Sequence, residues 1–218
     1  MARLDHIGDV APALLVQMAE RERVLVLIDS LRYRDPRVSI DRVKLTFPNP
    51  AGRWPPTLWR YFESLDGPGA ATVSTGAVGE VRIESLPADR SYYLHGAALL
   101  AHEAAIRLRL VPLAVYQMPP QLGWVCMEGV ELTGPGTFAF QTMGNALTFH
   151  LHPGETVRCA PHAFLGMTPG VTVNVRIFGG APGFPFNHYF PLVDLTGPGD
   201  VLVHSGEFLP PSAPAEGP

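Results

Sequence analysis

Histidine is the residue type in this 218-residue chain that most invites metal chemistry, and there are eight of them. His150 and His152 form a His-x-His pair near the expected end of a β-strand, where alternation would place both rings on one face. His162 and His204 occur in the same third of the chain. Two interpretations stay open: these four side chains form a metal site of cupin type, or His150 lies on a solvent-exposed strand face and His152 in a turn. We prefer the second, so the sequence predicts neither a metal nor a cofactor.

Signatures of other enzyme classes are missing from the sequence. It contains no Gly-x-Ser-x-Gly elbow for a nucleophilic serine. It has no Walker phosphate-binding loop, and Gly134-Pro135-Gly136 cannot replace one because proline has no backbone N–H. We therefore predict no catalytic residues.

The two cysteines, Cys126 and Cys159, both occur in apolar alternating runs. Neither has a second cysteine close by in the sequence, which disfavours a disulfide or a metal pair. We expect both to be small buried residues, the usual place for a free cysteine.

A repeated turn organises the chain around these residues. A Gly-Pro-Gly motif occurs at 67–69, 134–136 and 197–199, each time after a leucine and one further residue. Proline fixes φ and the glycines tolerate positive φ, so the motif predicts a tight turn. An alternating run follows each copy, which is typical of a strand. Near-constant spacing of such copies indicates an internal repeat.

Alignment of Val38, Ile106 and Val171 extends the repeat to most of the chain. It predicts a single all-β domain over residues 1–209, with antiparallel repeats at about 10–77, 78–143 and 144–209 related by a pseudo-threefold axis. In each repeat we expect an incoming strand, a second strand, a small-residue segment, a strongly alternating strand, a Pro-rich connection, and a strand leading to the Gly-Pro-Gly turn. The Pro-rich tail 210–218 is expected to be disordered.

Composition narrows the class of protein. With 46% hydrophobic and 17% charged residues, the chain is expected to fold around a sizeable core. A formal net charge of −4 argues against a nucleic-acid binder. The sequence has no apolar run long enough for a transmembrane segment and no signal-peptide pattern, so a cytoplasmic location is expected.

The third repeat carries a family resemblance. Its motifs are Leu151–Glu155 with Pro153-Gly154-Glu155, residues 163–171, Phe178-Gly179-Gly180 and Leu195–Gly199. In this order and spacing they resemble the altered-inheritance-of-mitochondria protein 24 family, whose fold is similar to the tryptophan RNA-binding attenuation protein. The first repeat departs from the pattern, with Ala19-Glu20-Arg21-Glu22 in place of Pro-Gly-Glu.

The resemblance implies an all-β fold of the short double-stranded β-helix type. It implies no established activity for bacterial members, and a link to inner-membrane organisation for the mitochondrial member, which suggests a scaffold. We therefore expect a non-enzymatic binding or scaffold protein that acts through self-association or protein–protein contact. The alternative is a cupin-like enzyme dependent on a metal or a small molecule.

The Pro-rich connections are the expected contact surface, since loops carry function more often than the scaffold beneath them. Their aromatic and methionine residues could form a partner site or fold back as caps over the core, and both interpretations stay open. Peripheral membrane contact by the same segments is a further alternative. The candidate residues are Trp54, Trp59, Tyr116, Met118, Trp124, Phe184 and Phe186.

Overall fold

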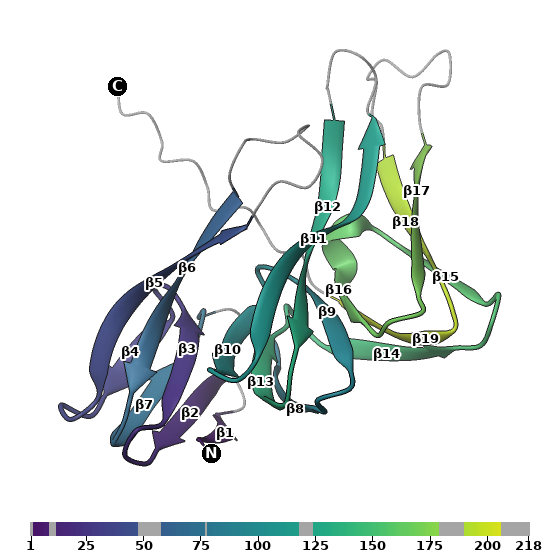
Figure 1. Ribbon diagram of the computed structural model, residues 1–218. Helices are drawn as coiled ribbons and strands as arrows, with labels where there is room; N and C mark the ends of the chain where they lie inside the picture. The colour runs from purple at the N-terminus through teal and green to yellow at the C-terminus, as the bar shows by residue number, and fades with distance from the viewer. Residues whose placement is uncertain are drawn as a thin grey trace, which may run out of the picture.

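The computed structural model describes residues 2–8, 12–47, 58–76, 78–117, 124–178 and 190–205, and almost all of its regular structure is β-strand (Figure 1). The all-β prediction is confirmed. Within these residues, no helix is long and apolar enough to cross a membrane. The predicted tail 210–218 lies outside the described residues.

After an N-terminal strand β1 (Arg3–Ile7), the strands fall into three successive sets of similar layout. The first set is β2 (Ala13–Met18), β3 (Arg23–Leu27), β4 (Leu31–Arg34), β5 (Ser39–Phe47), β6 (Leu58–Asp66) and β7 (Gly69–Val73). The second is β8 (Val81–Leu86), β9 (Ser91–His95), β10 (Leu99–Glu103), β11 (Arg107–Gln117), β12 (Trp124–Thr133) and β13 (Gly136–Gln141). The third is β14 (Ala146–Leu151), β15 (Thr156–Cys159), the 3-10 turn η1 (Pro161–Ala163), β16 (Phe164–Met167), β17 (Thr172–Phe178), β18 (Phe190–Thr196) and β19 (Gly199–His204).

Equivalent positions in the sequence open equivalent strands. Leu31, Leu99 and Phe164, which align in the repeat, begin β4, β10 and β16. The sequence indicated only a small-residue segment at these places and did not predict β1, so four strands are additions to the expected pattern. The pseudo-threefold axis, the β-helix type and the domain boundary stay predictions.

The strands form four antiparallel sheets. The two central sheets have six strands each, in the orders β5-β6-β3-β10-β13-β8 and β11-β12-β9-β16-β19-β14. Each takes three strands from one set and three from the next, joined by the pairs β3–β10 and β9–β16. A four-stranded sheet β1-β2-β7-β4 and a three-stranded sheet β15-β18-β17 form the two ends (Figure 1). Neighbouring sets are therefore tied together by continuous backbone hydrogen bonding.

Three apolar cores correspond to the three sets of strands. In the strand after each Gly-Pro-Gly turn, every second residue points into the core of its own set. In the second set these residues are Phe138 and Phe140. The residue between them faces the preceding set, because Ala139 belongs to the first core. Leu202 of the third set likewise belongs to the second core. Each set therefore completes the core of its neighbour.

The Gly-Pro-Gly turn packs against the turn that precedes the second strand of the same set. Gly67 and Gly197 donate their N–H groups to the carbonyls of Glu22 and Glu155, each at 2.9 Å. The carboxylates of the same glutamates accept from the N–H groups of Ala19 and His152, each at 2.7 Å. These bonds satisfy backbone donors that the turns would otherwise leave unpaired.

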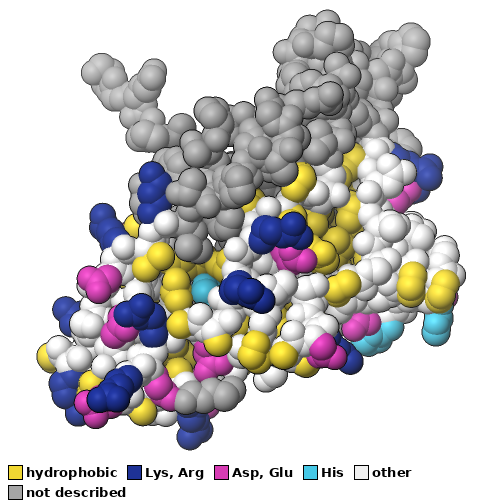
Figure 2. Space-filling model, viewed as in Figure 1, with side chains coloured by type: hydrophobic (Ala, Val, Ile, Leu, Met, Phe, Trp, Pro, Cys, Tyr) yellow, Lys and Arg dark blue, Asp and Glu magenta, His cyan; other side chains and the backbone are white. Residues whose placement is uncertain are grey.

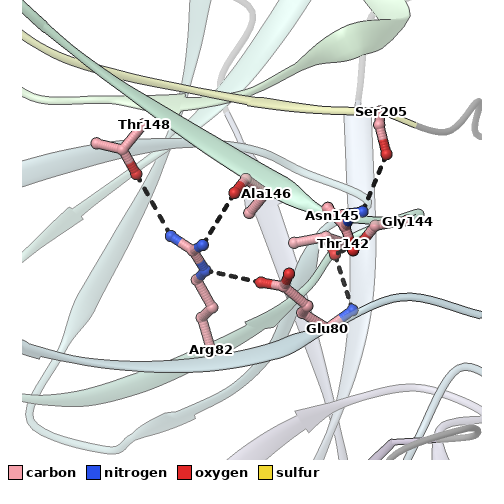
Figure 3. A network of polar contacts seen from close by, with 8 residues as sticks. All are labelled: Glu80, Arg82, Thr142, Gly144, Asn145, Ala146, Thr148 and Ser205. Atoms are coloured by element: carbon pink, nitrogen blue, oxygen red, sulfur yellow. Dashed lines mark hydrogen bonds and ion pairs between the residues drawn. The ribbon is translucent and has the colours of Figure 1, made fainter.

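A polar network ties the second set to the third (Figure 3). The guanidinium of Arg82 on β8 donates to the carbonyl of Ala146 at 3.0 Å and contacts the Glu80 carboxylate at 3.2 Å. The Thr142 hydroxyl accepts from the Glu80 N–H at 2.9 Å and donates to the Gly144 carbonyl at 2.6 Å. Arg82 thus forms a hydrogen bond with the carbonyl of Ala146, the first residue of β14, on the outer edge of that strand.

Candidate functional site

Most of the predicted contact surface lies outside the described residues: Trp54, Met118, Phe184 and Phe186. The backbones of Trp59, Tyr116 and Trp124 belong to β6, β11 and β12, but their side chains also lie outside the described part of the structure. The contact surface therefore stays a prediction.

The four histidines of the predicted metal alternative occupy different environments. His150 is exposed on β14, and its Nδ1 lies 2.7 Å from an Asp200 carboxylate oxygen. His152 and His162 are exposed, in the turn after β14 and in η1. His204 is buried at the end of β19, opposite Ala146. Among the described residues, no three His, Cys, Asp or Glu side chains gather closely enough to hold a metal ion.

A buried histidine that the sequence did not single out lies where the first two sets of strands meet. His102 is only 2% exposed and sits on β10, opposite Leu25 of β3. Its Nδ1 lies 2.9 Å from the Glu103 carbonyl, its Nε2 has no hydrogen-bond partner among the described residues, and its ring meets Phe62 edge-on with centroids 5.6 Å apart. Burial lowers the pKa of His102 to about 4. The ring is therefore neutral near pH 7, and these contacts provide no acid–base partner for it.

Two acidic side chains on the outer sheet faces are held in ion pairs. Asp194 is buried on β18 between Arg158 and Arg176, with N–O distances of 2.5 and 2.6 Å. Its hydrogen bonds to Arg158 are the main reason that its pKa is lowered. Glu131 on β12 contacts Arg109 at 2.6 Å and accepts from the Tyr93 hydroxyl at 3.2 Å. Such satisfied pairs brace neighbouring strands and leave these carboxylates engaged rather than poised for acid–base work.

The free edge of β14 is the most distinctive surface in the described structure. Leu147 and Phe149 point to the same face of this strand. Although both side chains are apolar, Leu147 is 49% exposed and Phe149 is 36% exposed. Leu14 and Val16 hold the equivalent positions on β2 and are fully buried, because β1 pairs with β2 and contributes Leu4 to the same core. In Figure 2, hydrophobic and histidine side chains lie together on the surface where Figure 1 places β14.

Cys159 is a free thiol on the strand β15 but is only half-buried, whereas the sequence analysis expected it to be buried. Burial raises the pKa of this thiol to about 11 from an ordinary 9.0. The side chain of Cys126 lies outside the described residues.

The raised pKa predicts that Cys159 reacts slowly in the folded protein. In a Cys126→Ser variant at pH 8, alkylation by iodoacetamide should be at least about a hundredfold slower than in urea-unfolded protein, because the thiolate is the reacting form. Mass spectrometry of timed samples measures both rates. Rates within tenfold of each other would contradict the assigned burial.

Comparison with known proteins assigns a family and a fold. The family profile described as mitochondrial biogenesis AIM24 matches residues 6–206 and so confirms the resemblance found in the sequence. The X-ray structure of Protein SPYM3_0169 from Streptococcus pyogenes is similar over 95% of this chain and 94% of that chain, with a TM-score of 0.71 and 12% sequence identity. That similarity supports the fold alone. No functionally curated protein matches the sequence.

Proposed function

Since this chain belongs to the mitochondrial biogenesis AIM24 family, we propose that it is a non-enzymatic binding or scaffold protein that acts through self-association or protein–protein contact. A cytoplasmic location belongs to the same proposal. In this proposal the partner is a protein and not a nucleic acid, because a net charge of −4 gives the chain no general attraction to phosphate groups.

The filling of the interior is the observation that carries the proposal. The buried members of the three cores are Leu, Val, Ile, Phe, Met and Ala side chains. A cupin-like enzyme would need a polar interior in which several titratable groups converge on one substrate. Here the buried His102 meets Phe62, and the buried Asp194 is paired with arginines on an outer face.

The connections that carry Trp54, Met118 and Phe184 are the contact surface in this proposal. Aromatic and methionine side chains are enriched at protein interfaces, and loops at equivalent positions of a repeat would present them together. Their alternative role is to cap the ends of the cores.

Two measurements on the purified full chain test the proposed function. Sedimentation velocity from 1 to 100 µM should show a concentration-dependent oligomer, and elemental analysis should show no stoichiometric metal. Changing Trp54, Met118 and Phe184 together to serine should weaken association if these residues form the contact surface.

The cupin-like alternative makes the opposite prediction for both measurements. A monomer that carries one tightly bound metal per chain would overturn the scaffold proposal. An unchanged oligomer with a lower melting temperature in the triple variant would assign those three residues to capping and leave the scaffold proposal intact.

A further inference from the structure

The free edges of the four sheets differ in how they are protected. Exposed edge strands invite pairing with another chain, and proteins usually block this with charged residues. Every other edge strand of the described sheets carries at least one Asp, Glu, Lys or Arg: β1, β4, β5, β8, β11, β15 and β17. The edge strand β14 carries none, and its sequence is Ala-Leu-Thr-Phe-His-Leu.

The corresponding strands of the other two sets explain why this edge is unusual. On β2 the edge is covered by β1, so Leu14 and Val16 are buried. On β8 the equivalent positions are the polar Arg82 and Glu84. Only β14 combines an apolar face with an uncovered edge among the described strands of this type.

We propose that β14 pairs antiparallel with β14 of a second copy of this chain, in a register centred on Phe149. The inference rests on the self-association part of the proposed function, and it adds a second contact surface on β14, separate from the connections that carry Trp54, Met118 and Phe184. Pairing about a twofold axis joins two six-stranded sheets into one continuous sheet and gives both copies the same contacts.

The backbone of β14 fixes which groups are available. The Ala146 carbonyl points to the outer edge, because it accepts from Arg82. The preceding residue faces the other way: the Asn145 carbonyl accepts from the N–H of Ser205, the residue after β19, and the Asn145 N–H donates to the Ser205 hydroxyl. Alternation therefore directs the N–H and C=O groups of Thr148 and His150 outward as well. A register centred on Phe149 pairs Thr148 with His150 of the second copy and leaves Ala146 bonded to Arg82.

The same register brings the apolar side chains together. Phe149 lies opposite Phe149 of the second copy, and Leu147 lies opposite Leu151 of the second copy on the same face. Directly opposed aromatic and apolar side chains stabilise the pairing of antiparallel strands. The pairing covers the exposed parts of Leu147 and Phe149, as β1 covers Leu14 and Val16 within the chain.

Sedimentation of a Phe149→Lys variant of the full chain tests this surface. Two charges placed opposite each other should raise the dimer dissociation constant at least about thirtyfold. Val78→Lys is the matched control, since Val78 is 73% exposed and lies outside every edge strand. It should dimerise like the wild type.

Disulfide trapping tests the register and remains informative if Phe149→Lys folds poorly. Opposed residues in a non-hydrogen-bonded antiparallel pair have a Cα separation that suits a disulfide. Phe149→Cys should therefore form a covalent dimer on mild oxidation, whereas Leu147→Cys alone should not, and Leu147→Cys with Leu151→Cys should. The wild type under the same oxidant measures background from its own cysteines.

The outcomes separate this inference from the proposed function. A dimer that survives Phe149→Lys and is not trapped by Phe149→Cys overturns pairing through β14 but leaves self-association in place. A wild type that stays monomeric up to 100 µM overturns both pairing through β14 and self-association, and leaves contact with a different protein as the remaining form of the proposed function.

Discussion

Gly197→Ala is expected to lower the free energy of unfolding by about 3 kcal/mol, the upper range for forcing extra atoms into a packed site. A Cβ at this position would lie 2.6 Å from the Leu151 Cβ and 2.7 Å from the His152 carbonyl oxygen. Neither neighbour can move freely, because the Gly197 N–H is bonded to the Glu155 carbonyl and the His152 N–H to the Glu155 carboxylate. Urea unfolding followed by circular dichroism measures the change.

Gly154→Ala is the matched control within the same pair of turns. Gly154 has a φ of +85°, but nothing lies within 4 Å of an added Cβ. Its substitution should cost only the backbone strain, about 1 kcal/mol. Equal losses in the two variants would show that close packing of the Gly-Pro-Gly turn does not account for the effect at Gly197.

The turns and their spacing made the general fold predictable. Each Gly-Pro-Gly turn does lead into a strand, since its second glycine opens β7, β13 and β19. Incoming strands end at the aligned positions Met18, Leu86 and Leu151. Local backbone preferences determine such features, so one sequence is enough to find them.

The strands β10 and β16 were not predicted because they are buried on both faces. They therefore lack the alternation of polar and apolar residues that identified the other strands. Every residue of both strands is buried, including His102 and Glu103. A strand covered on both faces shows no alternation of polar and apolar residues. The apolar composition of β10 is explained by its pairing with β3 of the preceding set, which buries it. That partner is far away in the sequence, so local patterns cannot reveal it.

The departure of the first repeat from Pro-Gly-Glu proves superficial in structure. Glu22 binds the Ala19 N–H as Glu155 binds that of His152. Arg21 adopts a φ of +67° where the third repeat has Gly154. The second repeat has Pro87 at the position of Ala19, and a proline has no N–H for a glutamate to accept. The first and third repeats therefore share the same hydrogen bonds without sharing the same residues, and the second repeat lacks the bond to the glutamate.

The candidate site was less predictable, for physical reasons that differ by residue. His150 and His152 are spaced as metal ligands would be, yet ligand spacing says nothing about third and fourth ligands from distant strands. The free edge of β14 became visible only once its neighbours were known, because exposure of Leu147 and Phe149 depends on the absence of a covering strand like β1. His102 is a single histidine in an apolar run, a pattern with no specific meaning.

His102→Met is expected to remove a large part of the acid sensitivity of this protein. Burial lowers the pKa of His102 to about 4 in the folded chain, below the ordinary value of 6.5 that applies on unfolding. The unfolded state therefore binds the proton more readily, so stability is fully present above pH 6.5 and is lost as the pH falls towards 4. This single group should cost the wild type roughly 2 kcal/mol between pH 7 and pH 5.

The equivalent residue in the third set shows that methionine is a suitable replacement for His102. Met167 occupies the position of His102 in the third set, on β16 where it pairs with β9, and it is buried there. Methionine should therefore fit at residue 102 and retain the apolar contact with Phe62. Urea unfolding at pH 7 and pH 5 should show that the variant loses roughly 2 kcal/mol less than the wild type.

His152→Gln is the matched control, because folding leaves the His152 ring exposed to water. This variant should keep the acid sensitivity of the wild type. If His102→Met and the wild type lose the same stability from pH 7 to pH 5, then the ring of His102 can be protonated inside the fold without penalty. Water would then have to reach the ring beside Phe62, which the near-complete burial of both Phe62 and His102 opposes.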